Sequence, residues 1–324
     1  MPVTRRLGPR DVDEAAAILR AGGLVALPTE TVYGLGGDAT NPAAVAAIYA
    51  AKERPRFNPL IAHVPDRAAA GHLGRIEGVA GALAERFWPG PLTLVVPAAA
   101  GCPVSDLARA GLDSVALRVP AHPLARALLV AVGRPVAAPS ANRSGRISPT
   151  EAGHVLATLD GRIDAVLDGG PTSVGLESTI VACLDGPPRL LRPGGLPREA
   201  IEAALGMKLL GPEESDGAPR APGMLPSHYA PRARVRLDAG AIRPGEAALL
   251  FGPAAPAGLE HAALALNLSP AGDLAEAAAN LFGHLHLLDA AGAPVIAVAP
   301  VPGGGLGEAI RDRLSRAAAE RDSA

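Results

Sequence analysis

LVALPTETVYGLGGD, residues 24–38, is the stretch that decides the fold. Leu24 to Leu27 is a run of four apolar residues, which predicts a buried strand that ends at Pro28. Hydroxyl-bearing and glycine-rich residues follow at once, in Pro28–Gly36 (PTETVYGLG). Ligands of open α/β sheets bind beyond the carboxyl ends of strands, so this loop is a candidate binding site. The alternative is an ordinary strand-to-loop turn, and composition alone does not separate the two.

Apolar runs and amphipathic stretches alternate after that strand. Asn41 is a good N-cap and Pro42 suits the first helical position, which predicts a helix over about Pro42–Glu53. The alternation favours an α/β fold with a mixed sheet. Further strands are expected at Leu60–Val64, Leu92–Val96, Val115–Val119, Val136–Ala138, Ala165–Leu167 and Ser178–Leu184. Further helices are expected at Val79–Phe87, Pro123–Val132, Thr150–Leu159 and Pro197–Leu205.

A change of composition divides the chain. Gly211–Arg232 is polar, rich in proline and glycine and without apolar period, which is typical of a linker. Strand and helix patterns resume after it, at Ala247–Phe251, Ala263–Leu266, Leu274–Leu288, Val295–Val301 and Leu306–Ala319. We therefore expect a first domain at residues 1–208, a linker or lid at 209–232 and a small C-terminal α/β domain at 233–324.

Composition and charge exclude several classes of protein. The 324 residues suggest about two domains, and 48% hydrophobic residues suffice for a core. A formal net charge of -2 excludes a strongly basic nucleic-acid coat. Two cysteines, Cys102 and Cys183, exclude a disulfide framework and a cysteine-rich zinc site. The N-terminus lacks the apolar segment of a signal peptide, and no apolar run is long enough to span a membrane. We expect a cytoplasmic protein without a membrane association.

Common catalytic and nucleotide motifs are missing. Neither lysine follows a glycine, which excludes a P-loop, and Gly34, Gly36 and Gly37 do not have dinucleotide-fingerprint spacing. The chain also lacks a G-x-S-x-G elbow and an H-E-x-x-H pair. The glycine-rich Pro302–Gly307 is interpreted as a tight turn.

The stretch Lys52–Leu60 (KERPRFNPL) places three cations within five residues at the end of a predicted helix. Two of the 30 basic residues are lysines, Lys52 and Lys208, and the other 28 are arginines. A lysine retained in so arginine-rich a chain favours a need for a compact ammonium. We interpret Lys52 and Arg54 as a phosphate clamp. The alternative is a pair of cations that stabilises the helix C-terminus through the helix dipole.

Three further polar groups interrupt or follow predicted strands. Ser140–Gly145 (SANRSG) carries small donors able to bind an anion, although such residues also form ordinary turns. Arg118 lies within an apolar strand and needs a partner or solvent, as on an edge strand. Gly175–Thr179 (GLEST) precedes a strand, and Arg192-Pro193-Gly194 follows the next one. His63, taken alone, is more typical of a packed core histidine than of a catalytic one.

Together and in this order, these motifs resemble the threonylcarbamoyl-AMP synthase family in its longer two-domain form, over nearly the whole chain. The carrying motifs are PTETVYGLG, Lys52-x-Arg54 with Asn58-Pro-Leu, Arg118-Val-Pro, Ser140-x-Asn142, Glu177-Ser-Thr with Arg192-Pro-Gly, Ser227–Pro231 (SHYAP) and Gly305–Ile310 (GLGEAI). The resemblance implies a YrdC-like twisted mixed sheet with helices and a small Rossmann-like C-terminal domain.

The resemblance also implies an activity and a set of site residues. The enzyme would be a nucleotidyltransferase that makes threonylcarbamoyl-AMP and pyrophosphate from L-threonine, bicarbonate and ATP, with Mg²⁺ on the phosphates. A separate transferase would carry the product to tRNA, without stable tRNA binding by this chain. Lys52 and Arg54 would be catalytic. Contacts to ATP are implied for Arg54, Asn58, Ser114, Ser140, Asn142, Ser148, Arg192 and Tyr229, and contacts to threonine for Thr31, His63, Arg118, Ala138 and Ser178.

Two other functions are alternatives for this sequence. One is an RNA-binding YrdC-like module without synthase activity, in which Arg54, Arg56, Arg143 and Arg146 line a basic groove. The net charge and the 2% aromatic content argue against it as the main role. The other is a carbamoyl-transfer enzyme of the hydrogenase-maturation kind, which two cysteines and the absence of extra domains disfavour.

Overall fold

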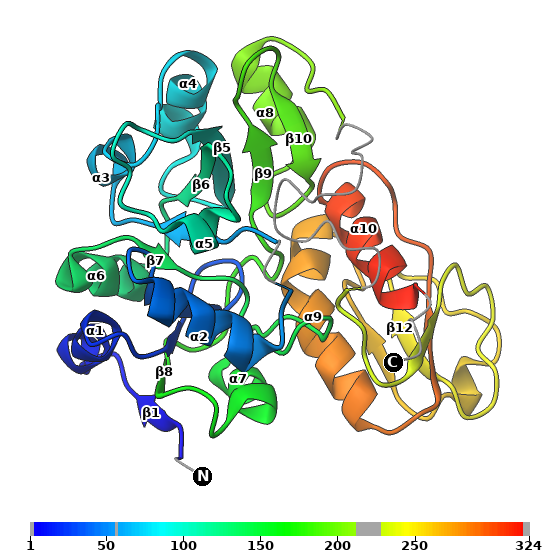
Figure 1. Cartoon of the computed structure of the whole chain (residues 1–324). Coiled ribbons are helices and arrows are strands. Elements are labelled where there is room, and N and C mark those ends of the chain that lie inside the picture. The colour runs from blue at the N-terminus through cyan, green and yellow to red at the C-terminus, as the bar shows by residue number, and fades with distance from the viewer. Residues whose placement is uncertain (1–2, 56–57, 212–227, 320–324) are drawn as a thin grey trace.

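The computed structural model of the chain describes residues 3–55, 58–211 and 228–319 and arranges them as two α/β units (Figure 1). The larger unit is built on a ten-stranded mixed sheet, as expected, in the order β1-β8-β2-β3-β7-β4-β6-β5-β9-β10 within the described residues. Its strands are β1 (Arg5–Leu7), β2 (Val25–Leu27), β3 (Gly34–Asp38), β4 (Ile61–His63), β5 (Leu92–Pro97), β6 (Ser114–Arg118), β7 (Val136–Ala137), β8 (Ala165–Leu167), β9 (Thr179–Ala182) and β10 (Arg189–Arg192).

Helices connect these strands and cover both faces of the sheet (Figure 1). They are α1 (Val12–Arg20), α2 (Pro42–Lys52), α3 (Arg67–Gly71), α4 (Gly78–Phe87), α5 (Asp106–Arg109), α6 (Pro123–Val132), α7 (Ala152–Leu159) and α8 (Arg198–Leu205). The predicted start of α2 is confirmed, because Asn41 accepts hydrogen bonds from the N–H groups of Ala43 and Ala44. Glu53 ends the helix in the left-handed region, at φ +54°.

Successive side chains along each strand point to opposite faces of the sheet. Val25 and Leu27 pack with α1 and α6, whereas Leu24 and Ala26 pack on the other side with α2 and α7. All four side chains are buried, which explains the continuous apolar run in the sequence. The sheet is therefore covered on both sides at β2.

Strand β3 corrects the interpretation of the glycine-rich stretch as a loop. Residues 34–38 lie between β2 and β7 and pair antiparallel with both. A Cβ atom on Gly36 would lie 2.9 Å from the carbonyl oxygen of Val25, and one on Gly34 would lie 3.1 Å from Ala138 Cβ. These glycines therefore let three backbones approach closely, and no side-chain alternation marks the strand.

The second unit is built, as far as the structure describes it, on a four-stranded, all-parallel sheet in the order β11-β14-β12-β13. Its strands are β11 (Arg234–Arg236), β12 (Ala247–Leu250), β13 (Ala265–Asn267) and β14 (Val295–Val298), and its helices are the 3₁₀ helix η1 (Leu259–His261), α9 (Leu274–Ala290) and α10 (Leu306–Ala318). Leu249 packs against α9 and α10, while Ala248 and Leu250 face the opposite side. This is the small α/β unit that the sequence predicts.

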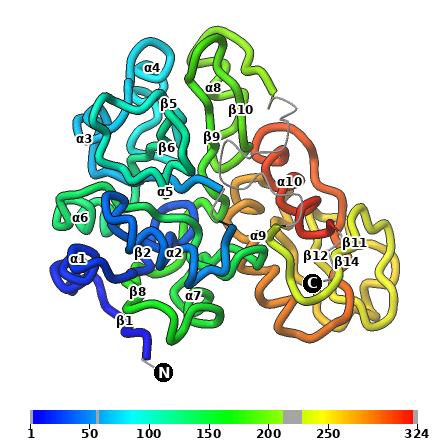
Figure 2. Tube along the Cα trace, in the orientation of Figure 1, coloured from blue at the N-terminus to red at the C-terminus, as the bar shows by residue number. Residues whose placement is uncertain are grey.

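Helices α9 and α10 join the two units. They stand between the small sheet and the larger unit (Figures 1 and 2). Their apolar cluster includes Val32, Ile147 and Leu176 of the larger unit. The backbone of Gly175 approaches α9 so closely that a Cβ atom would lie 2.4 Å from the carbonyl oxygen of Ala278. Residues 212–227 of the expected linker or lid lie outside the described residues.

Within the part of the chain that the structure describes, no helix has the length and apolar character needed to cross a bilayer.

Candidate active site

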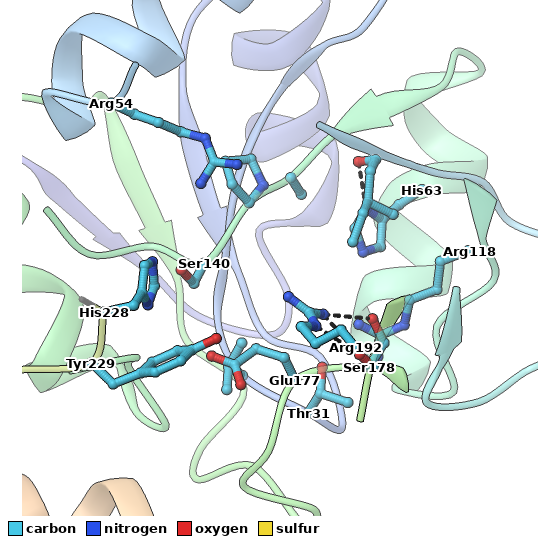
Figure 3. A pocket seen from close by; sticks show the side chains of 14 residues that line it. Thr31, Arg54, His63, Arg118, Ser140, Glu177, Ser178, Arg192, His228 and Tyr229 are labelled. Atoms are coloured by element: carbon cyan, nitrogen blue, oxygen red, sulfur yellow. Dashed lines mark hydrogen bonds between the residues drawn. The ribbon is translucent and has the colours of Figure 1, made fainter. Parts of the chain in front are cut away.

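A cavity with about 500 Å³ of empty space, part of it open to solvent, lies where several strands of the large sheet start or end (Figure 3). His63, Arg118 and Arg192 line it from the carboxyl ends of β4, β6 and β10. Ala138 lines it from directly after β7, which runs antiparallel to β4, next to Ile61 at the start of β4. The lining residues are Thr31, Val32, Arg54, Ile61, His63, Arg118, Ala138, Pro139, Ser140, Glu177, Ser178, Arg192, His228 and Tyr229. Nine of these fourteen are candidates from the sequence, and they come from segments far apart in the chain.

The cavity has two sides (Figure 3). Arg54, His228 and Tyr229 approach from one side, and His63 and Arg118 from the other. Arg192 and Ser178 lie between them. Two reactants could therefore meet at the centre of this cavity.

Arg54 is a buried cation with unused hydrogen-bonding capacity. It follows the left-handed Glu53 that ends α2, and only 8% of it is exposed. Its Nη2 donates to Pro59 O at 3.4 Å, while its Nε has no partner among the described residues. Burial lowers its pKa to about 10, so it stays charged at neutral pH. Buried donors are rarely left unpaired, which points to an anion from outside the protein.

Two amide side chains also have buried polar atoms without a hydrogen-bond partner. Both polar side-chain atoms of Asn58, and the Oδ1 atom of Asn142, are buried without a partner in the described chain. The other side-chain atom of Asn142, Nδ2, donates to Arg143 O and Arg146 O, which ties down the loop after Ser140. Together with Arg54 Nε, these atoms form a group of unsatisfied donors and acceptors beside the cavity.

Lys52 does not lie where a phosphate clamp would require it. It is 1% exposed and is not among the residues that line the cavity. Its ammonium donates to Ser140 O and to Asn142 O, at 2.5 Å each. Burial, and then the charge of Arg54, lower the pKa of Lys52 well below its usual value, while the two carbonyl oxygens favour the protonated form. Here Lys52 fixes the Ser140–Asn142 loop from behind.

Arg118 is held by a buried ion pair that sequence reasoning missed. Its Nη2 lies 2.7 Å from Glu30 Oε1, and its Nε donates to Gly90 O. The second oxygen of Glu30 accepts from Ala121 N at 3.0 Å. The signal was present, because a cation in an apolar strand needs a partner, and Glu30 stands in the PTETVYGLG motif.

His63 lies next to Arg118, its register partner across β4 and β6. Its Nδ1 is 3.2 Å from Ile61 O, so the tautomer that satisfies this carbonyl leaves Nε2 as an acceptor. Burial and the charge of Arg118 lower the pKa of His63 to about 3. The ring is therefore neutral at physiological pH and can accept a hydrogen bond from a ligand amine.

Ser178 and Arg192 are fixed on adjacent strands. Arg192 donates from Nη2 and Nε to Ser178 O, at 2.8 and 3.2 Å. The Ser178 hydroxyl is 2.7 Å from that of Thr93. A Cβ atom on Gly194 would lie 2.5 Å from the Ser178 carbonyl carbon, so glycine allows the turn after Arg192 to pack against Ser178.

Two other residues of the cavity were quoted in sequence motifs without a role. Glu177 is buried, and its oxygens accept from Ser148 Oγ and Arg313 Nε. Burial alone would raise its pKa, but the charges of Arg313 and Arg192 outweigh burial and lower it to about 2. His228 is also buried, and burial lowers its pKa to about 3.

Five expected site residues do not line the cavity: Lys52, Asn58, Ser114, Asn142 and Ser148. Four of them lie within or beside the hydrogen-bond network just described. Ser114 stands apart, because it begins β6 and pairs with Pro97, four residues before Arg118. At about 3.3 Å per residue it lies roughly 13 Å along the strand from the cavity end.

Charge around the cavity is strongly unbalanced. In the described chain, the buried cations at or against it are Lys52, Arg54, Arg118, Arg192 and Arg313, and the buried carboxylates are Glu30 and Glu177. A polyanionic ligand would offset this excess. Small donors beside the cations, such as Ser140 and Ser178, suit phosphate and carboxylate oxygens.

Comparisons with known proteins cover nearly the whole chain. The family model described as Telomere recombination matches residues 17–194, and that described as Threonylcarbamoyl-AMP synthase, C-terminal domain, matches residues 196–319. The chain is 42% identical to a threonylcarbamoyl-AMP synthase of Bacillus subtilis (98% of this chain, 96% of that one). It is 40% identical to one of Pyrococcus abyssi (98% and 97%).

A solved structure is also similar to this chain over nearly its whole length. The crystal structure of P. abyssi Sua5 complexed with L-threonine has a TM-score of 0.87 to this chain at 38% identity. The similarity covers 98% of this chain and 97% of that one, so both α/β units are included.

Proposed function

Because the chain belongs to the threonylcarbamoyl-AMP synthase family, we propose that it makes threonylcarbamoyl-AMP and pyrophosphate from L-threonine, bicarbonate and ATP. The supporting observation is the cation-lined cavity, in which one side suits an amino acid and the other suits a nucleotide.

On the amino-acid side, Arg118 would bind the carboxylate of threonine. Glu30 and Gly90 already orient its guanidinium, and its Nη1 has no hydrogen bond to any described residue. The neutral His63 would accept a hydrogen bond from the threonine amine. Thr31 and Ser178 would bind the side-chain hydroxyl, and Ala138 would contribute through its backbone and methyl group.

On the nucleotide side, Arg54 and Arg192 would neutralise the phosphates. Asn58, Asn142, Ser140 and Ser148 would supply further hydrogen bonds, and the unpaired atoms of Asn58 and Asn142 support this role. Tyr229, which is 1% exposed, would cover the nucleotide and exclude water from a hydrolysable adenylate. Residues 228–232 would then act as the described part of a lid.

The reaction would proceed in two steps. The amine nitrogen of threonine attacks the carbon of bicarbonate, and the resulting N-carboxylate forms with loss of water. An oxygen of this carbamate then attacks the α-phosphorus of ATP, and the bond between that phosphorus and the bridging oxygen breaks to release pyrophosphate. Cations on both reactants reduce the repulsion between two anions, and holding them together supplies most of the rate enhancement.

Lys52 would contribute in two ways. Its two bonds to carbonyl oxygens position the Ser140–Asn142 loop against the phosphates. An ammonium has three donors, so one N–H group of Lys52 is available for an oxygen of the transition state. Its compact charge suits this buried position better than a guanidinium.

Mg²⁺ would arrive with ATP. The described residues contain no group of three or more histidine, cysteine or carboxylate side chains suited to a metal ion, and both oxygens of Glu30 and of Glu177 are engaged. The side chains therefore do not fit a resident metal site, and we treat the ion as part of the substrate, MgATP.

The product would be passed to a separate tRNA-modifying threonylcarbamoyl transferase, since no step above involves tRNA. We also propose that the protein acts in the cytoplasm. We propose residues 1–208 as the catalytic domain and 233–324 as the C-terminal domain. The core around β2 and α2 extends to Leu209, one residue past that boundary, which supports a division close to this point.

Pyrophosphate release tests the proposal. The purified chain, incubated with ATP, bicarbonate and L-threonine, should release pyrophosphate only when threonine is present. L-Serine and bicarbonate-free buffer are the matched controls. Release that is independent of threonine, or no release beside an active control enzyme, would refute the proposed function.

A further inference from the structure

Glu177 is a carboxylate in a cavity that we propose binds a triphosphate. Because two anions repel each other, the presence of Glu177 there requires an explanation. Its Oε1 accepts from Ser148 Oγ at 2.5 Å, and its Oε2 accepts from Arg313 Nε at 2.8 Å. With both oxygens engaged, Glu177 is neither a free metal ligand nor a free base. Its geometry instead joins a residue of the larger unit to a residue of the second unit.

Arg313 is the residue that reaches across. It belongs to α10, yet its side chain is fully buried against the cavity wall. Besides Glu177, its Nη2 donates to Pro193 O at 2.9 Å. Its guanidinium carbon also lies 5.2 Å from the ring centroid of Tyr229, within range of a cation–π contact.

The Nη1 atom of Arg313 also donates to Asp312 Oδ2 within α10, at 2.5 Å. The three groups that Arg313 contacts outside α10 all belong to the nucleotide side. Glu177 holds Ser148, Pro193 directly follows Arg192, and Tyr229 is the proposed cover of the nucleotide. Within the described residues, Arg313 has no hydrogen bond to Thr31, His63 or Arg118, which form the amino-acid side. One planar side chain with several donors can hold these segments in a fixed relative position, which a lysine cannot do.

A second contact from the same unit strengthens this arrangement. His286 of α9 has its Nε2 3.2 Å from Ser148 O, and its ring stacks on His154 at a centroid distance of 3.8 Å. Ser148 is thus held through its backbone by α9 and through its hydroxyl by the Glu177–Arg313 pair.

We infer that Arg313 is a positioning residue for ATP, supplied by the C-terminal domain. It aligns Arg192, Ser148 and Tyr229 without touching the reacting atoms. The inference rests on the proposed function and adds a reason for the second domain: the nucleotide side is incomplete without it.

Arg198 offers a matched control. Its ion pair with Glu308, at 2.6 Å, also joins the larger unit to α10. Both side chains are about one-third exposed, and neither lines the cavity. If α10 served only to hold the two units together, replacing either arginine would change the kinetics in the same way.

The test uses the full chain with Arg313→Met, Arg313→Lys and Arg198→Met. Steady-state pyrophosphate release gives kcat and the KM for ATP and for threonine, calorimetric titration gives the ATP affinity, and circular dichroism checks folding. Both Arg313 variants should raise the KM for ATP roughly 10- to 100-fold, because misplaced binding groups cost about that much. The KM for threonine should change less than about twofold, and Arg198→Met should leave both KM values unchanged.

The inference can still be tested if one of the variants fails to fold. If Arg313→Met fails to fold because Glu177 is left buried and unpaired, Arg313→Lys and the double variant Glu177→Gln/Arg313→Met avoid that defect. A folded Arg313 variant with wild-type ATP affinity, or with equal losses for ATP and threonine, would overturn the inference. A wild-type chain without threonine-dependent pyrophosphate release would instead overturn the proposed function.

Discussion

The ammonium of Lys52 donates a hydrogen bond of 2.5 Å to the carbonyl oxygen of Ser140, 88 residues later in the chain. This bond joins the C-terminus of α2 to the loop after β7, and Asn142 O receives a second one. The two motifs that the sequence suggested as parts of one anion site are therefore in direct contact. Arg54, two residues further on, shares the cavity with Ser140.

Lys52→Ala should reduce turnover by roughly 10²-fold or more, because an oriented donor to the transition state and the anchor of the Ser140 loop are both lost. Lys52→Arg should not restore it, since a guanidinium is too large for the two carbonyl oxygens. Lys208→Ala is the control, because this second lysine is 88% exposed. Wild-type pyrophosphate release by Lys52→Ala would contradict the role.

Asn58→Ala should weaken ATP binding without destabilising the free protein. The amide is buried and unpaired in the described structure, so its removal leaves the free energy of unfolding unchanged or raises it by about 1 kcal/mol. Differential scanning fluorimetry checks this, with a smaller ATP-induced rise in Tm expected for the variant. A variant that loses stability and keeps the full ATP response would show that Asn58 is structural.

Glu30→Gln should raise the KM for threonine roughly tenfold or more and change that for ATP much less, since Glu30 orients Arg118 through a buried ion pair. Arg134→Gln is the control, because it breaks an ion pair with Asp38 on β3 in which Arg134 is half exposed. Steady-state kinetics with each substrate varied separates the two effects. Equal KM changes for both substrates would argue against a specific role in threonine binding.

Acidification should destabilise the protein through its buried histidines. The pKa of His63 is about 3 when folded and about 6.5 in an unfolded chain, so the unfolded state binds an extra proton as the pH falls from 6.5 toward 3. Stability from this group is thus complete above about pH 6.5 and declines below it. Glu177, with its pKa lowered to about 2, adds a further loss below about pH 4.5.

Urea unfolding at pH 7 and pH 5 checks this. The free energy of unfolding should fall less between these pH values in His63→Asn than in the wild type, whereas the exposed His72→Asn should match the wild type. An unchanged slope in His63→Asn would show that His63 does not stay neutral in the folded protein.

Sequence reasoning located elements that a continuous apolar run or a cap defines, such as β2, α2 and β9. It missed β3, because Gly34 and Gly36 form a strand through close backbone packing against neighbours that only the fold supplies. It also missed the short β1 and helix α1, which lie before the decisive stretch.

In the candidate site, too, sequence reasoning found some residues and missed others. Motifs identified the cations, since each stands out in its own stretch of sequence. They did not identify their partners, because Arg118 meets Glu30 across 88 residues and Arg313 meets Glu177 across 136. Such pairs depend on tertiary contacts, so local patterns carry no signal for them. For the same reason, the sequence did not reveal that Lys52 faces two carbonyl oxygens.

Isotope labelling of the product is the sharpest test of a carbamate attacking ATP in this cavity. The chain is incubated with ATP, L-threonine and ¹³C-bicarbonate, and the products are separated and weighed by mass spectrometry. The expected result is a threonylcarbamoyl adenylate that carries one ¹³C atom and forms only when all three substrates are present. An unlabelled threonyl adenylate, in which the amino-acid carboxylate itself has attacked the α-phosphorus, would contradict the proposal that Arg118 holds that carboxylate and the carbamate reacts.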